Sequence, residues 1–139
     1  MKQIAFYKGP GRFFDRVIRE YQDHFLDCGD ASIYSHTVNI IDGQAFEADA
    51  WSGRVISRPW EGNYYPPNYD IVEVTRETRP VQFLIDQVGK RYDYPGVVGF
   101  ILPFRPEIPN WLYCSEFSAL WLMEKNTRLA PGEVAKLKF

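Results

Sequence analysis

Hydrophobic residues recur along the chain at two spacings, about two residues in some segments and three to four in others. Short runs rich in β-branched and aromatic residues, at 3–7, 33–41, 44–50 and 69–75, predict four strands. Asp42-Gly43, between the second and third runs, favours a two-residue hairpin turn. An antiparallel sheet is therefore expected.

Apolar side chains at spacings of three and four predict amphipathic helices over residues 13–26 and 81–88. Thr78 would cap the second of these helices and Gly89 would end it. After an irregular stretch with several prolines, a third helix would begin around Cys114. The pattern predicts an α+β domain in which the antiparallel sheet packs against about three helices.

Length and composition agree with a single domain over residues 1–139, because 45% of the residues are hydrophobic and 17% aromatic. Sixteen Lys and Arg against 18 Asp and Glu leave a formal net charge of −2, so no nucleic-acid partner is expected. Lysines interrupt the N-terminal segment, and the apolar run at 97–104 is far shorter than the ~20 residues that span a bilayer. We expect a protein synthesised in soluble form, without a signal peptide or an integral membrane segment.

Cys114 is the candidate nucleophile. It lies where an extended segment turns into an apolar helix, so its sulfur would lie at the helix N-terminus. Unpaired amide donors and the positive end of the helix dipole favour an anion there. With an imidazole nearby, the pKa of such a thiol falls from its usual ~8.5 and a thiolate forms at neutral pH. A buried and inert cysteine is the alternative.

His36 is the candidate base, because imidazole can take and return a proton near neutral pH. A tight turn at Asp42-Gly43 would pair His36 with Asp49. The same register pairs Val38 with Glu47, so both carboxylates would share the His36 face. Either carboxylate could then hold the imidazole in the required tautomer. A one-residue change in loop length would move both to the other face.

The soft metal ligands of the chain are His24, Cys28, His36 and Cys114. Their spacing fits no compact zinc unit, so no metal and no other cofactor is expected. Two cysteines are too few for a disulfide scaffold, although one Cys28–Cys114 bridge stays possible. The chain carries no nucleotide-binding glycine motif and no serine-hydrolase elbow.

Four motifs follow one another in a characteristic order: Tyr34-Ser35-His36, Phe46-Glu47-Ala48, Gly89-Lys90-Arg91-Tyr92-Asp93 and Tyr113-Cys114-Ser115-Glu116. This order resembles the circularly permuted branch of the NlpC-type papain-like hydrolases, the YiiX-like permuted amidases of bacteria and their phages. Residues 4–9, 14–18 and 128–131 resemble small phage-encoded members. The resemblance covers nearly the whole chain.

The resemblance implies a permuted papain-like fold with Cys114 as nucleophile and His36 as general base and acid. It also implies that Glu47 orients the histidine. Tyr92 would stabilise the oxyanion through its hydroxyl, together with the backbone amide of Cys114. The permutation explains why the histidine precedes the cysteine.

Two of these roles have alternatives. Asp49 is the alternative to Glu47, and Tyr94 and Tyr113 are alternatives to Tyr92.

By this resemblance the chain is a cysteine hydrolase that cleaves amide bonds through a thioester, with peptidoglycan stem peptides or their fragments as substrates. It would act in a virion or at the cell wall. One alternative is a thioesterase or acyltransferase, similar to relatives of lecithin–retinol acyltransferase, with the proline- and aromatic-rich loops 57–68 and 95–111 lining an apolar groove. A second alternative is a non-catalytic binding or virion-assembly module on the same scaffold.

Overall fold

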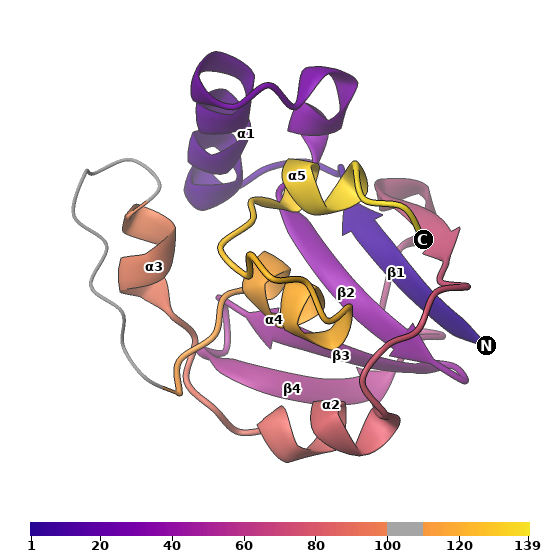
Figure 1. Cartoon of the computed structure of the whole chain (residues 1–139). Coiled ribbons are helices and arrows are strands. Elements are labelled where there is room, and N and C mark those ends of the chain that lie inside the picture. The colour runs from indigo at the N-terminus through magenta and orange to yellow at the C-terminus, as the bar shows by residue number, and fades with distance from the viewer. Residues whose placement is uncertain (100–109) are drawn as a thin grey trace.

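In a computed structural model, which describes residues 1–99 and 110–139, the chain is built around a five-stranded sheet with the order β4-β3-β2-β1-β5. The strands are β1 (Lys2–Tyr7), β2 (His36–Ile41), β3 (Gln44–Asp49), β4 (Arg54–Pro59) and β5 (Tyr69–Glu73). All neighbouring strands are antiparallel. The N-terminal strand lies between β2 and β5, so the strand order differs from the chain order (Figure 1).

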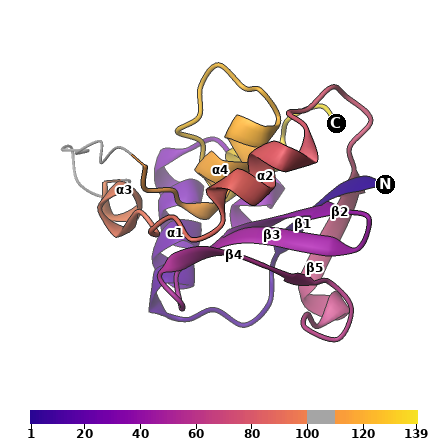
Figure 2. The same cartoon turned by 90° about the horizontal axis from the view of Figure 1, so that it is seen from below.

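Five α-helices lie in the described part of the chain: α1 (Phe13–Phe25), α2 (Val81–Gln87), α3 (Tyr94–Val98), α4 (Cys114–Trp121) and α5 (Pro131–Ala135). Two short 3₁₀ segments, Gly29–Ile33 and Pro66–Asn68, precede β2 and β5. Helix α4 contacts β2 and β3, and it lies on the same side of the sheet as α2 (Figure 2). The architecture is therefore α+β, as the sequence predicts.

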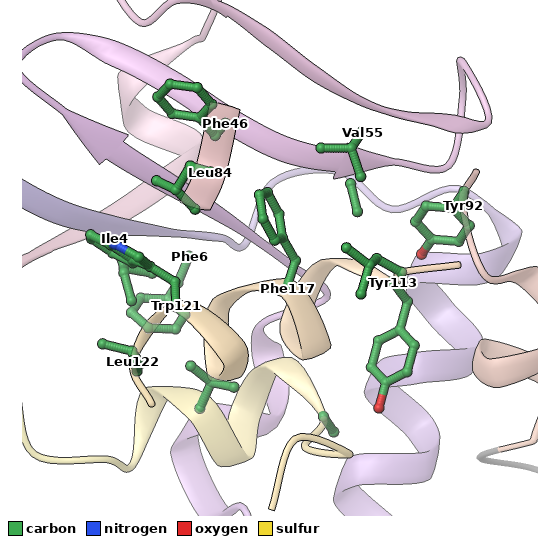
Figure 3. Packing of buried hydrophobic residues seen from close by; sticks show 14 of the residues in the cluster. Ile4, Phe6, Phe46, Val55, Leu84, Tyr92, Tyr113, Phe117, Trp121 and Leu122 are labelled. Atoms are coloured by element: carbon green, nitrogen blue, oxygen red, sulfur yellow. The ribbon is translucent and has the colours of Figure 1, made fainter. Parts of the chain in front are cut away.

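A hydrophobic core fills the space between the sheet and α4 (Figure 3). Phe117 and Trp121 from α4 are fully buried and pack in one cluster with Ile4, Phe6 and Phe46 from the strands. Burying side chains of this size stabilises the fold by roughly 2–3 kcal/mol each. This packing holds α4 against the sheet and thereby fixes the position of its first residue.

The opposite face of the sheet is covered by a different part of the chain. Ala5, Val38, Ile40 and Ala45 form a second buried cluster there, and Trp60, Tyr64 and Tyr69 pack against it. Trp60 and Tyr64 belong to the connection between β4 and β5. The term "aromatic cover" below means Trp60, Tyr64 and Tyr69.

The predicted hairpin and its register are confirmed for the pairs nearest the turn, but the ladder does not contain the predicted pairs Val38–Glu47 and His36–Asp49. Ile41 is paired with Gln44 and Asn39 with Phe46. Asp42 and Gly43 both have positive φ, 49° and 79°, as a type I′ turn requires. The first strand of the hairpin, β2, starts at His36 rather than at residue 33, because Gly29–Ile33 forms a 3₁₀ segment.

The prediction of a loop over residues 57–68 is wrong in its first part. Strand β4 continues to Pro59 and pairs with β3 along its whole length. It lies at the edge of the sheet, where a strand needs no long apolar run and where proline is tolerated.

The helices also differ from the prediction in number and in one cap. Helices α3 and α5 have five residues each, too few for a helical period to be visible in the sequence. The residue at the N-cap position of helix α2 is Pro80, which makes no capping hydrogen bond, and the hydroxyl of Thr78 donates instead to the Arg79 carbonyl at 3.0 Å.

One buried amide links three parts of the chain. Gln22 of α1 is fully buried, and its Nε2 donates hydrogen bonds to the carbonyls of Ser32, at 3.1 Å, and Tyr34, at 2.7 Å. Its Oε1 accepts a hydrogen bond from the Gly132 N–H at 2.6 Å. Gln22 thus joins α1 and α5 to the segment that leads into β2.

We expect Gln22→Leu to lower the free energy of unfolding by about 2–4 kcal/mol, because it leaves buried backbone groups without partners. Denaturant titration followed by circular dichroism measures this. Gln82→Leu is the control, since Gln82 is exposed and its side chain donates to Asp86, on the same helix, at 2.7 Å. Equal and small losses in the two variants would contradict the role given to Gln22.

Candidate active site

Cys114 is the first residue of α4, as the sequence predicts, and only 3% of it is exposed. The N–H of Ser115, the next residue of the helix, is directed at the Cys114 sulfur and lowers its pKa. The positive end of the helix dipole acts in the same direction. The start of α4 therefore favours a thiolate at this position.

A second backbone donor reaches the sulfur from the sheet. The ladder between β2 and β3 extends only from Ile41–Gln44 to Asn39–Phe46, although β1 and β2 stay paired as far as His36. Beyond that point the N–H of Thr37 is directed at the Cys114 sulfur and lowers its pKa. The sulfur thus lies where β2 and β3 have separated.

A buried hydrogen bond sets α4 in register with β2. The hydroxyl groups of Thr37 and Ser118 lie 2.8 Å apart, and both residues are almost fully buried. Ser118 is one helical turn after Cys114, and Thr37 directly follows His36. This contact holds the start of the helix opposite the start of the strand.

The structure brings His36, Glu47 and Cys114 together. The Nε2 atom of His36 lies 2.6 Å from Oε2 of Glu47. Cys114 lies close enough to the ring for each group to shift the pKa of the other toward its charged form, and Nδ1 is the ring nitrogen that Glu47 leaves open. The side chain of His36 keeps 19% of its surface exposed, against 4% for Glu47.

Glu47 has two further partners, both on its other oxygen. Arg58 Nη2 donates to Oε1 at 2.9 Å, and the Tyr64 hydroxyl donates to the same oxygen. Burial alone would raise the pKa of Glu47. The hydrogen bonds from His36 and Tyr64 and the charge of Arg58 outweigh burial and lower this pKa to about 2. Glu47 is therefore ionised at neutral pH.

The pKa values of His36 and Cys114 move toward a charged pair. Burial alone would lower the pKa of His36, but the charge and hydrogen bond of Cys114 and those of Glu47 raise it well above its usual range. Burial would likewise raise the pKa of Cys114, but His36 and the two backbone N–H groups lower it. The arrangement favours thiolate and imidazolium at neutral pH.

Tyr92 lies beside this pair. Its N–H donates to the Gly53 carbonyl at 2.8 Å, and a parallel bridge joins it to Leu112, two residues before Cys114. Tyr92 is almost fully buried, and burial, together with the nearby Cys114, raises the pKa of its hydroxyl well above the usual value. The hydroxyl therefore stays protonated at neutral pH and can donate a hydrogen bond.

Two of the alternative residues named from the sequence, Asp49 and Tyr94, are bound elsewhere. Asp49 accepts hydrogen bonds from the N–H groups of Trp51, at 3.2 Å, and Ser52, at 3.0 Å, within the β3–β4 turn. The Tyr94 hydroxyl donates to the Ala50 carbonyl. The ring of Tyr113 points away from that of Tyr92 (Figure 3). Glu47 is thus the carboxylate that bonds His36, and Tyr92 is a tyrosine whose hydroxyl pKa is raised by burial and by the nearby Cys114.

The remaining soft side chains lie outside this site. Cys28 and Cys114 are both free, and the pKa of Cys28 is raised, chiefly by burial and by Glu133. His24 is exposed and pairs with Glu20 at 3.1 Å. Among the described residues, no group of three or more His, Cys, Asp or Glu side chains is arranged to hold a metal ion.

None of the helices that the structure describes is long and apolar enough to cross a bilayer.

Comparisons with protein-family models, with curated proteins and with solved structures find no match to this chain.

Three groups that act on Glu47 or on the Cys114 sulfur do not follow from the predicted elements: Arg58, Tyr64 and the N–H of Thr37. Arg58 was placed in a loop, but β4 pairs Ile56 with Glu47 and Ala45 with Arg58, so Arg58 is a diagonal neighbour of Glu47. A hairpin interpretation of the turn before Arg54 would have found it. Nothing in the sequence indicates that Tyr64 folds back onto Glu47.

The charged pair leads to a prediction about thiol reactivity. We expect iodoacetamide at mildly acidic pH to alkylate Cys114 much faster than Cys28, because only Cys114 has a lowered pKa. His36→Ala removes the cation and should slow this reaction. Peptide mass spectrometry after timed quenching measures both rates. Slow and equal labelling of the two cysteines would contradict the charged pair.

Proposed function

We propose that the protein is a cysteine hydrolase that cleaves amide bonds through a thioester acyl-enzyme. The observation that carries the proposal is the juxtaposition of Cys114, His36 and Glu47: His36 Nε2 lies 2.6 Å from Glu47 Oε2, His36 lowers the pKa of the thiol, and Cys114 raises that of the imidazole. A nucleophile, a base and an orienting carboxylate in contact are the parts that acyl transfer needs.

The reaction proceeds in two steps. The Cys114 thiolate attacks the amide carbon, and a C–S bond forms while the carbonyl oxygen takes the negative charge. As the C–N bond breaks, the imidazolium of His36 gives its proton to the leaving amine. Water then attacks the thioester, His36 takes a proton from that water, and the C–S bond breaks to release a carboxylic acid. Glu47 holds the ring in one orientation throughout.

The oxyanion is stabilised by the backbone N–H of Cys114 and by the hydroxyl of Tyr92. The first N–H groups of a helix have no partner within the helix, and Cys114 is the first residue of α4. Tyr92 remains a donor because its pKa is raised. Donors that are in place before the charge develops lower the barrier of such steps.

A permuted papain-like fold of the NlpC type agrees with the order of these elements along the chain. The histidine lies on a strand early in the chain, and the cysteine begins a helix that packs on that strand much later. The motif order that resembles the YiiX-like permuted amidases supports the same assignment.

Peptidoglycan stem peptides, or fragments of them, are the proposed substrates, on the strength of that resemblance. The acyl-ester alternative depended on segments 57–68 and 95–111 as the walls of a groove. Trp60 and Tyr64 pack under the sheet instead, and residues 100–109 lie outside the described part of the chain. The amide hydrolase is therefore the function that we test first.

We expect Cys114→Ala and His36→Ala to abolish hydrolysis of muropeptides, because they remove the nucleophile and the proton carrier. Chromatography of the products against a parallel panel of acyl esters measures the activity. Release of acids from the esters alone would favour the thioesterase alternative. No turnover of either class by the unmodified protein would favour the non-catalytic module.

Tyr92→Phe should lower kcat by about 100-fold and leave KM nearly unchanged, because the lost hydrogen bond forms only as the oxyanion develops. Tyr94→Phe is the matched control, since the Tyr94 hydroxyl donates to the Ala50 carbonyl. Steady-state kinetics on the same muropeptide separates the two variants. A larger loss of kcat in Tyr94→Phe would assign the oxyanion role to Tyr94.

A further inference from the structure

We infer that Arg58 and Tyr64 form a clamp on Glu47 that sets the pH range in which the pair of Cys114 and His36 is charged. The inference depends on the proposed function, because it assigns positioning residues to that same site. Neither residue touches Cys114 or His36 through a hydrogen bond given by the structure, so both would act through Glu47.

The two carboxylate oxygens of Glu47 have different hydrogen-bond partners. Oε2 bonds His36, whereas Oε1 receives both Arg58 and Tyr64. With both oxygens bound, the carboxylate plane cannot rotate without breaking a charge-assisted hydrogen bond. The orientation of the His36 ring is thereby fixed from the side away from Cys114.

Arg58 and Tyr64 also bind each other. Arg58 Nε donates to the Tyr64 hydroxyl at 3.0 Å, and its guanidinium carbon lies 4.8 Å from the centre of the Tyr64 ring. Together with Glu47 they form a closed triangle of contacts. Each member is therefore held in place by the other two.

The aromatic cover shields this triangle from water. Trp60 stacks on Tyr64 with 4.3 Å between ring centres, and Tyr69 meets both rings edge-on at 5.2 and 5.7 Å. As a result, the Glu47 side chain is almost fully buried, although that of Arg58 keeps 41% of its surface exposed. Charges act more strongly on one another in such a site than in water.

Other charged or titratable groups lie around the site: Asp15 of α1 and Asp49 of β3 act on Tyr92, Tyr7 of β1 and Asp15 act on Tyr69 of β5, Arg19 of α1 donates to Ser35, and Glu116 belongs to α4. Arg58 differs from these groups because it is the cation that is hydrogen-bonded to Glu47.

The charge of Arg58 determines the direction in which the neighbouring pKa values move when it is removed. Loss of the Arg58 charge makes protons bind more tightly to Glu47, to Cys114 and to His36. Both limits of the charged pair, protonation of the thiolate in acid and deprotonation of the imidazolium in base, should then move to higher pH. Loss of the Tyr64 hydroxyl removes only the positive end of an O–H dipole from Glu47, so both limits should rise in the same direction, but by less than on loss of the Arg58 charge.

The test is the rate of Cys114 alkylation by iodoacetamide as a function of pH, in a Cys28→Ala background. In Arg58→Gln both limits should move up by at least about half a pH unit, which is modest because Arg58 is partly exposed. Arg58→Lys should restore most of the shift, since it keeps the charge. In Tyr64→Phe both limits should move up by less than in Arg58→Gln, since no full charge is lost.

Two controls match these variants. Arg54→Gln removes an equal charge from the same strand, and Tyr65→Phe removes the hydroxyl of the exposed neighbouring tyrosine. Neither should move a limit. Circular dichroism establishes that each variant is folded, and if Arg58→Gln does not fold, the acid limit of Tyr64→Phe decides alone.

The outcomes distinguish this inference from the proposed function. A wild-type profile in which alkylation is low in acid and rises only near the pKa of an ordinary thiol would overturn the charged pair and the hydrolase proposal with it. A wild-type profile with an acid-shifted limit that Arg58→Gln and Tyr64→Phe leave unmoved would overturn only the clamp.

Discussion

The separation of β2 from β3 beyond Asn39 and Phe46 is the constraint on which the candidate site depends. Helix α4 packs on one face of the sheet, whereas Glu47 shares the opposite face with Ala45 and the aromatic cover. An unbroken ladder would keep a sulfur on the first face apart from a carboxylate on the second. Where the strands part, His36 contacts both, and the Thr37 N–H bonds the sulfur.

Burial and charge oppose each other throughout the site. Burial alone would favour neutral forms of Glu47, His36 and Cys114, yet each pKa moves in the direction of the charged form. The charged forms of Glu47, His36 and Cys114 are therefore stabilised by one another, and each buried charge would be unfavourable without the others. A buried ion pair of this kind contributes little to net stability, which agrees better with a chemical than with a structural purpose.

The sequence was sufficient for the parts of the site that follow local rules. The Asp42-Gly43 turn predicts the register of the pairs nearest the turn and leaves Glu47 and Asp49 as alternative partners of His36, and the transition into an apolar helix predicts the position of Cys114. The position of Arg58 could not be predicted, because an edge strand with charged residues gives a weak periodic signal. The contact between Tyr64 and Glu47 could not be predicted, because it joins a loop to a strand through tertiary structure. The burial of Gln22 could not be predicted either, because a buried amide has no sequence pattern of its own.

The link made by Gln22 has a consequence for how the protein is synthesised. Its side chain connects the segment that enters β2 to Gly132, which lies 110 positions after Gln22 in the chain. Cys114 also emerges from the ribosome long after His36 and Glu47. A nascent chain therefore holds His36 and Glu47 without Cys114 for about half of translation, and the three side chains come together only when the late helix α4 packs on the sheet. The thiol of Cys114 therefore acquires its lowered pKa only after the whole chain has folded.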